Sequence, residues 1–183
     1  NKDGSVVQNT EKKADSVVSV VRHERNTTGK DKRITLPDGS LIVLADKSEI
    51  TYSEPFTDKR DITLTGKAYF KVAKNKEKPF TVISDDIATT ALGTEFTVTT
   101  FSGTGQVIVR LYEGKVVIKA VRGNNGRLTK EVYLSPGQAF VYDVQNTAKL
   151  NSFKLKNGAV PESILNEEVV RDNPSLPENV ETP

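Results

Sequence analysis

Residues 60–72, RDITLTGKAYFKV, decide the fold class because they hold two strand patterns that meet at a glycine. The second pattern alternates apolar Ala68, Phe70 and Val72 with the side chains of Lys67, Tyr69 and Lys71. Successive side chains of a strand point to opposite faces of a sheet, so we expect the apolar three to be buried and the other three to face outward. Gly66 accepts a positive φ without steric cost, so we expect it to form the turn between the two strands.

Strand patterns continue on both sides of this stretch. Residues 95–99 and 107–112 repeat the alternation, whereas 41–44 and 116–118 are apolar at successive positions and predict more deeply buried strands. β-Branched residues dominate, and no window in the middle of the chain shows an apolar stripe at helical spacing. The sequence therefore predicts an all-β domain of short antiparallel strands.

Turn glycines recur after leucines along the whole β region. Gly39, Gly66, Gly93, Gly114 and Gly137 follow a Leu within one to three positions, and successive ones are 21 to 27 residues apart. Such spacing is typical of strand–turn–strand units that bury their apolar faces by stacking. It fits both a two-sheet sandwich and a β-solenoid-like coil, and the residues alone leave both arrangements open.

The 183 residues fit one domain with tails. We expect a flexible lead-in at 1–32 with a first strand at 17–22, a β domain at 33–150, and a linker with an acidic, Pro-containing tail at 151–183. A short helix is predicted over 163–170. The chain contains no Met, so we expect that a leader, an anchor or an upstream domain has been removed.

Composition narrows the function classes. The 26 basic and 24 acidic residues nearly balance, and no Lys/Arg cluster is interleaved with aromatics, so nucleic acid is not an expected partner. The absence of Cys excludes a disulfide framework and a thiolate metal site. No apolar run is long enough to cross a bilayer, so any membrane attachment is expected through an anchor outside this sequence.

Catalytic chemistry has few candidate residues. His23 is the only histidine, which excludes a two-histidine metal site, and we expect it to be solvated and without a role. Asp85 and Asp86 are adjacent, so on a strand they would point to opposite faces, and a turn is the favoured interpretation. We therefore predict no enzyme activity, no cofactor, and no catalytic, cofactor-binding or metal-binding residues.

The remaining motifs have structural explanations. Gly103–Gly105, Gly123–Gly126 and Asp38–Gly39 favour turns over phosphate or calcium sites, because no predicted helix or further acidic ligand accompanies them. Pro79–Phe80 either fixes the start of a strand, which we favour, or presents an aromatic ring to a partner. Asn26–Thr28 matches a glycosylation sequon, which matters only in a eukaryotic protein.

Seven sequence blocks, in order over about residues 33–144, resemble the FecR domain of bacterial sigma regulators, as found in Bacteroidetes. They are LPDGS at 36–40, LADKS at 44–48, RDITLTGKAYFKV at 60–72, PFTV at 79–82, LGTEFTV at 92–98, EGKV at 113–116 and LSPGQ at 134–138. The order makes the match specific. Two departures are Gly66-Lys67-Ala68, where the family usually has Gly-Glu-Ala, and the acidic tail after Pro161, where longer members carry a further domain.

The resemblance implies the extracytoplasmic part of an anti-sigma factor. In that family a cytoplasmic segment holds an extracytoplasmic-function sigma factor, and one helix crosses the inner membrane. The periplasmic region receives a signal from the N-terminal domain of a TonB-dependent outer-membrane transporter. We therefore expect a periplasmic, membrane-tethered sensor that works by protein contact. The alternative is a stand-alone FecR-like protein without a sigma partner, acting as a carbohydrate-binding, cell-surface or scaffold β domain.

Overall fold

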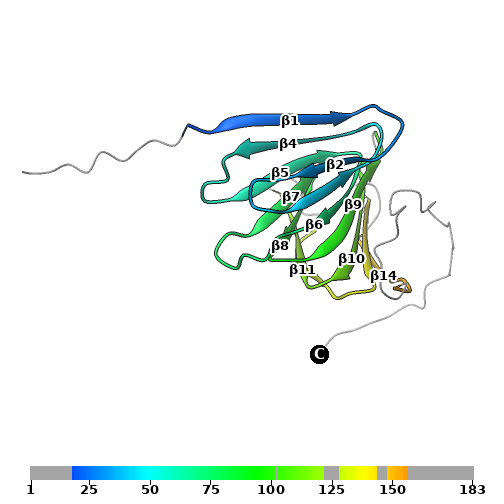
Figure 1. Cartoon of the computed structure of the whole chain (residues 1–183). Coiled ribbons are helices and arrows are strands. Elements are labelled where there is room, and N and C mark those ends of the chain that lie inside the picture. Colours follow the sequence, from blue (N-terminus) through cyan, green and yellow to red (C-terminus); the bar gives the residue numbers. More distant parts are fainter. Residues whose placement is uncertain (1–17, 102, 122–127, 144–147, 156–183) are drawn as a thin grey trace, which may run out of the picture.

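The computed structural model describes residues 18–101, 103–121, 128–143 and 148–155. In this part of the chain fourteen strands and no helix are present, and the strands form two seven-stranded sheets (Figure 1). The predicted all-β class is confirmed. The residues described here also include no helix long and apolar enough to span a membrane.

Each sheet is built from strands that are mostly antiparallel. The first sheet, sheet A, has the order β1 (Val20–Asn26), β4 (Ser48–Glu54), β5 (Arg60–Thr65), β7 (Phe80–Ser84), β8 (Ile87–Ala91), β11 (Val116–Ala120) and β12 (Val132–Leu134). Sheet B has the order β14 (Lys149–Ser152), β13 (Gln138–Asp143), β10 (Gln106–Glu113), β9 (Glu95–Phe101), β6 (Lys67–Lys71), β3 (Leu41–Leu44) and β2 (Lys32–Thr35). The pair β5–β7 is parallel.

Four of the five glycines of the leucine–glycine repeat lie where the chain changes sheets, whereas Gly39 lies in the turn between β2 and β3 of sheet B. Gly66 lies between β5 and β6, Gly93 between β8 and β9, Gly114 between β10 and β11, and Gly137 between β12 and β13. Each of these glycines has a positive φ and separates a strand of one sheet from a strand of the other. Because side chains from both sheets form one core cluster between them, the arrangement is a two-sheet sandwich rather than a solenoid-like coil.

Gly66 lies at the corner between β5 and β6, where the conformation and the close packing require a glycine. Its φ is +95°, a conformation that residues with a Cβ rarely adopt. An added Cβ would also lie 2.4 Å from Ser48 Oγ and 2.9 Å from Ser48 Cα. The corner therefore brings β6 of sheet B close to the first residue of β4 in sheet A.

Aromatic rings occupy the centre of the core. Phe70 of β6 stacks on Phe96 of β9 with ring centroids 5.1 Å apart, and meets Phe80 of β7 edge to face at 6.1 Å. All three side chains are fully buried, and burial of one Phe is worth roughly 2–3 kcal/mol. Phe80 therefore fixes the start of β7, and the option that it faces a partner is wrong.

Tyr69 departs from the expected alternation. It projects from the outer face of sheet B, as predicted, but only 3% of it is exposed. Its hydroxyl donates to the Glu95 carboxylate at 2.8 Å, and its ring meets Tyr112 edge to face. Burial, followed by the hydrogen bond to Glu95, raises the pKa of Tyr69. A tyrosine on an outer sheet face can be buried while its hydroxyl still has a polar partner. An alternation of apolar and polar residues does not distinguish such a buried tyrosine from an exposed one.

The described part of the expected lead-in contains an edge strand. β1 covers residues 20–26 rather than 17–22, and all seven of its residues pair with β4. Asn26 is fully buried, and its Nδ2 donates to the carbonyls of Lys30 (2.7 Å) and Leu44 (2.8 Å). The sequon asparagine is thus enclosed in the fold. The predicted helix at 163–170, the acidic tail and the turn at Gly123–Gly126 lie outside the described residues.

Candidate functional site

The residues considered for catalysis lie apart in the fold. Within the described ranges no group of three or more His, Cys, Asp or Glu could hold a metal ion. His23 is exposed on β1, where its Nδ1 is 3.0 Å from Thr51 Oγ1 and its Nε2 is 3.6 Å from the Glu49 carboxylate. Its contacts are those of a surface side chain between two strands.

Asp85 and Asp86 form the turn between β7 and β8, which confirms that interpretation. Asp85 adopts a left-handed conformation with φ of 49°, which Asp tolerates better than most residues. Partial burial and, secondly, the charge of Asp86 raise the pKa of Asp85. Asp38–Gly39 and Gly103–Gly105 are likewise turns, between β2 and β3 and between β9 and β10.

Arg60, the first residue of β5, organises one end of the sandwich. Its side chain is 2% exposed, and Nη1 donates to the Asp38 carboxylate at 2.7 Å and to the Ala73 carbonyl at 3.0 Å. Nε donates to the Lys78 carbonyl at 2.7 Å, and Nη2 to the Asn75 carbonyl at 3.3 Å. One buried guanidinium thus holds three carbonyls of the loop 72–79, which joins β6 to β7.

Arg60 and its partners, here called the hub, include two further contacts. The guanidinium carbon of Arg60 lies 5.5 Å from the centroid of the Phe80 ring, within cation–π range. Partial burial alone would raise the pKa of Asp38, but hydrogen bonds from Arg60 and Ser40 outweigh it and place the pKa below its ordinary value. The hub therefore keeps a carboxylate ionised beside a buried cation, and the loop 72–79 has a fixed shape.

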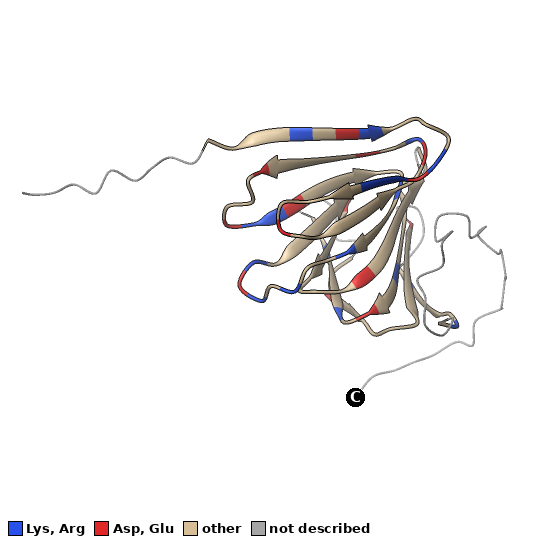
Figure 2. Ribbon diagram, viewed as in Figure 1, with Lys and Arg blue, Asp and Glu red and all other residues tan. Residues whose placement is uncertain are grey.

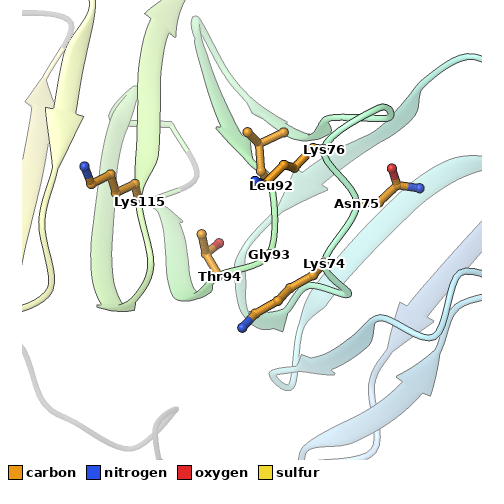
Figure 3. Close-up of a pocket in the computed structure, with 7 residues that line it drawn as sticks. All are labelled: Lys74, Asn75, Lys76, Leu92, Gly93, Thr94 and Lys115. Carbon is orange, nitrogen blue, oxygen red and sulfur yellow. The ribbon is translucent and has the colours of Figure 1, made fainter.

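Beside this loop is a pocket of about 330 Å³ (Figure 3). Its walls come from three connections of the sandwich: the loop 72–79, the turn between β8 and β9, and the turn between β10 and β11. The lining residues, here called the lysine pocket, are Lys74, Asn75, Lys76, Leu92, Gly93, Thr94 and Lys115. No carboxylate is among them, so the pocket carries three positive side chains without an acidic one.

Two backbone hydrogen bonds fasten the pocket walls together. Val72 N donates to Thr94 O at 2.9 Å, and Asn75 N donates to Leu92 O at 3.1 Å. Gly93 makes the close approach possible, because a Cβ there would lie 2.5 Å from Lys74 Cγ and 2.9 Å from Lys74 Cα. The lysine pocket is consequently a built feature of the fold.

β1 forms a second candidate site, an edge strand open on one side. One side of β1 pairs with β4, and no strand of the described chain pairs with the other. The other sheet edges are β12 with three residues and β2 and β14 with four each, whereas β1 has seven. Val20 and Val21 are 50% and 68% exposed. Unpaired edge amides and carbonyls are able to pair with a strand of another chain.

β1 carries charged residues of both signs, seen as blue and red segments of its ribbon in Figure 2, and each of them has an oppositely charged neighbour. Arg22 pairs with Glu54 of β4, Arg25 lies 3.8 Å from Glu49, and Glu24 accepts from Lys32 of β2 at 2.8 Å. Exposed pairs of this kind contribute little to stability, about 0–1 kcal/mol each. Their effect is to reduce the unpaired charge that would otherwise repel an incoming strand.

No local sequence pattern indicates these features. Lys74 and Lys76 come from the loop 72–79 and Lys115 from the turn between β10 and β11, and no local pattern shows that these connections meet. In the sequence, Arg60 is a charged residue at the start of a strand, and nothing around it indicates that it is buried. The exposure of Val20 and Val21 could be inferred only from the position of β1 at the edge.

Comparisons with known proteins found a matching family and similar solved structures. The model of the FecR family, "FecR protein", matches residues 23–117, just over half of the chain. Two crystal structures of a candidate anti-sigma factor from Parabacteroides distasonis share the fold at 23% identity, with TM-scores of 0.65 and 0.64. The alignments cover 73% and 72% of this chain, and this chain spans 61% and 60% of the length of the two crystallised chains. No curated protein matches.

The family match covers β1 through the first residues of β11, and with them both candidate sites, apart from the first three residues of β1. Residues 60–72, which contribute Arg60 and β6, lie in its middle. The chain belongs to the FecR family.

Proposed function

We propose that this chain is the extracytoplasmic signal-transmission domain of an anti-sigma regulator. It receives the state of a TonB-dependent outer-membrane transporter by contact with that transporter's N-terminal signalling domain. The response reaches an extracytoplasmic-function sigma factor through a membrane anchor and a cytoplasmic segment, so the domain works in the periplasm, tethered to the inner membrane. Membership of the FecR family and the fold shared with a candidate anti-sigma factor support this proposal.

The observation that carries the contact mechanism is the open edge of β1. A strand of the transporter domain would pair with β1 and extend sheet A, making main-chain hydrogen bonds that require little sequence specificity. Val20 and Val21 would then supply apolar contacts beside the added strand. The length of β1 favours it over the shorter edges β2, β12 and β14.

The aromatic residues favour protein contact over carbohydrate binding. A carbohydrate site generally needs several aromatic rings on one concave face. All twelve Tyr and Phe of the chain lie in the described part, and Tyr133, at 67%, is the one that is mostly exposed. The stand-alone carbohydrate-binding alternative therefore lacks a matching surface among these residues, and non-catalytic signalling remains the function we propose.

The test is titration calorimetry with the purified chain, its acidic tail intact, against the N-terminal signalling domains of TonB-dependent transporters from the source bacterium. Saturable binding of at least one domain is expected. Val21→Pro should abolish that binding, while Ser152→Pro, a matched proline on the edge strand β14, should not. Binding to none of the domains, with the fold intact by circular dichroism, would overturn the proposal.

A further inference from the structure

We propose that the lysine pocket binds an acidic peptide segment of a partner protein. This surface lies at the connections between the sheets, away from the open edge of β1. The inference goes beyond the proposed function, because it assigns a second contact and the charge of the segment that fills it, and it does not depend on strand addition.

The first argument is charge. Lys74, Lys76 and Lys115 line the pocket, their side chains are exposed, and no lining residue carries a negative charge. Elsewhere on the described surface, cations such as Lys32, Lys71 and Lys119 pair with a glutamate. None of the pocket lysines is in such an ion pair in the described part of the chain. A concave cluster of one sign attracts ligands of the opposite sign.

The second argument is an unsatisfied hydroxyl in the pocket wall. Thr94 is 4% exposed, and its Oγ1 is buried without a hydrogen-bond partner among the described residues. A buried hydroxyl without a partner costs about 1–3 kcal/mol, and such a group calls for an explanation. A carboxylate or amide oxygen of a ligand would accept this hydrogen bond after a small shift of the side chains over it.

The third argument separates a peptide from a small anion. The ammonium groups of Lys74 and Lys115 point in different directions in Figure 3, so one small anion would not meet both at once. Carboxylates spaced along an extended peptide could meet separate lysines. Leu92, which lies beside Lys76 in Figure 3, is 46% exposed and offers a contact for an apolar side chain of the same segment.

The pocket is also held ready for a ligand. Arg60 fixes the carbonyls of Ala73, Asn75 and Lys78, so the backbone that carries Lys74 and Lys76 is positioned before binding. Less loop ordering is then required when a ligand binds, and this favours affinity. Arg60 is in this sense a positioning residue for the pocket.

The test uses fluorescence polarisation with the full chain and a labelled peptide of about twelve residues that alternates Glu with Ser and Leu. A matched peptide carries Gln in place of every Glu. We expect the acidic peptide to bind and the Gln peptide not to bind. Raising the salt from about 50 to 300 mM should weaken binding several-fold, because exposed charges are screened over a shorter distance.

Two double variants locate the site. Lys74→Glu with Lys76→Glu should weaken binding at least about tenfold. Lys30→Glu with Lys130→Glu makes the same change in net charge at exposed positions that do not line the pocket and should change the affinity less than about twofold. Equal losses of peptide affinity in both double variants would show that the effect comes from net charge alone, and would overturn the assignment of the site to the lysine pocket.

Other outcomes are equally decisive. No binding of the acidic peptide by the folded chain overturns the proposal. Binding that appears only after residues 156–183 are removed shows that the pocket serves the chain's own acidic segment and overturns the assignment to a partner. Strand addition at β1 is tested separately with Val21→Pro. Failure of the acidic peptide to bind therefore leaves the proposed function standing, and failure of strand addition leaves the lysine-pocket proposal standing.

Discussion

Arg60 Nη1 lies 2.7 Å from the Asp38 carboxylate, and this ion pair joins the start of β5 to the turn between β2 and β3. The same guanidinium holds three carbonyls of the loop 72–79. One residue therefore couples the two sheets and shapes the wall of the lysine pocket.

Replacing Arg60 with Met should lower the free energy of unfolding by about 3–5 kcal/mol, because a partly buried carboxylate and three carbonyls lose their partner. Urea denaturation measures the change. Arg22→Met is the matched control, since Arg22 pairs with Glu54 at the surface with its side chain 53% exposed, and it should cost less than about 1 kcal/mol. Similar costs for the two variants would contradict the role given to the hub.

Asp38 should make stability depend on pH. Its pKa is lower in the folded protein than in the unfolded chain, so its stabilisation is present above the unfolded value, near 4, and is lost as the pH falls through the folded value. Unfolding free energies measured between neutrality and acid should therefore fall less steeply in Asp38→Asn than in the unaltered protein. Parallel curves would refute this linkage. Glu95, whose pKa is also lowered despite burial, by Lys71 and Tyr69, adds to the slope in both proteins.

The corner glycines should tolerate substitution poorly. Gly66→Ala places a Cβ 2.4 Å from Ser48 Oγ at a positive φ, and we expect a loss of about 2–4 kcal/mol. Gly103→Ala has a positive φ but open space around it, so only the backbone strain of about 1 kcal/mol applies. Thermal unfolding compares the two, and equal losses would show that the close approach at Gly66 is unimportant.

Thr94→Val should separate stability from binding. The substitution keeps the shape but removes the buried hydroxyl that lacks a partner, so the unfolding free energy should rise by about 1 kcal/mol. If a ligand accepts from this hydroxyl, affinity for the acidic peptide should fall in the same variant. Thr63→Val, on an exposed position of β5, is the control and should change neither quantity appreciably. A variant that loses stability would show that the hydroxyl has a partner in the folded protein.

Much of the fold could be predicted because local rules determine it. The alternation in residues 67–72 and the turn at Asp85–Asp86 each follow from strand geometry or turn chemistry. The strands at 41–44 and 116–118 were also predicted, but they are buried at alternate positions and not on both faces as expected. The glycine repeat is visible in the sequence, but its spacing alone does not distinguish a turn within a sheet from a crossing between sheets. The choice of a sandwich depends on which strands pair, and that information is spread along the chain.

The candidate sites were harder to foresee for a related reason. The lysine pocket combines three connections that are far apart in sequence, and Arg60 acquires its partners only when those connections meet. Tyr69 kept its predicted face, yet its burial depends on packing across the outer surface of sheet B. Charge and exposure at such positions follow from tertiary contacts, which a residue pattern does not contain.

The most direct test of the central claim is hydrogen exchange of the full chain with and without a transporter N-terminal signalling domain that binds it. Strand addition predicts that amides of β1 exchange at least about tenfold more slowly in the complex, while the short edges β12 and β14 change little. Unchanged exchange along β1 in a saturated complex would contradict the account, because the partner would then bind elsewhere.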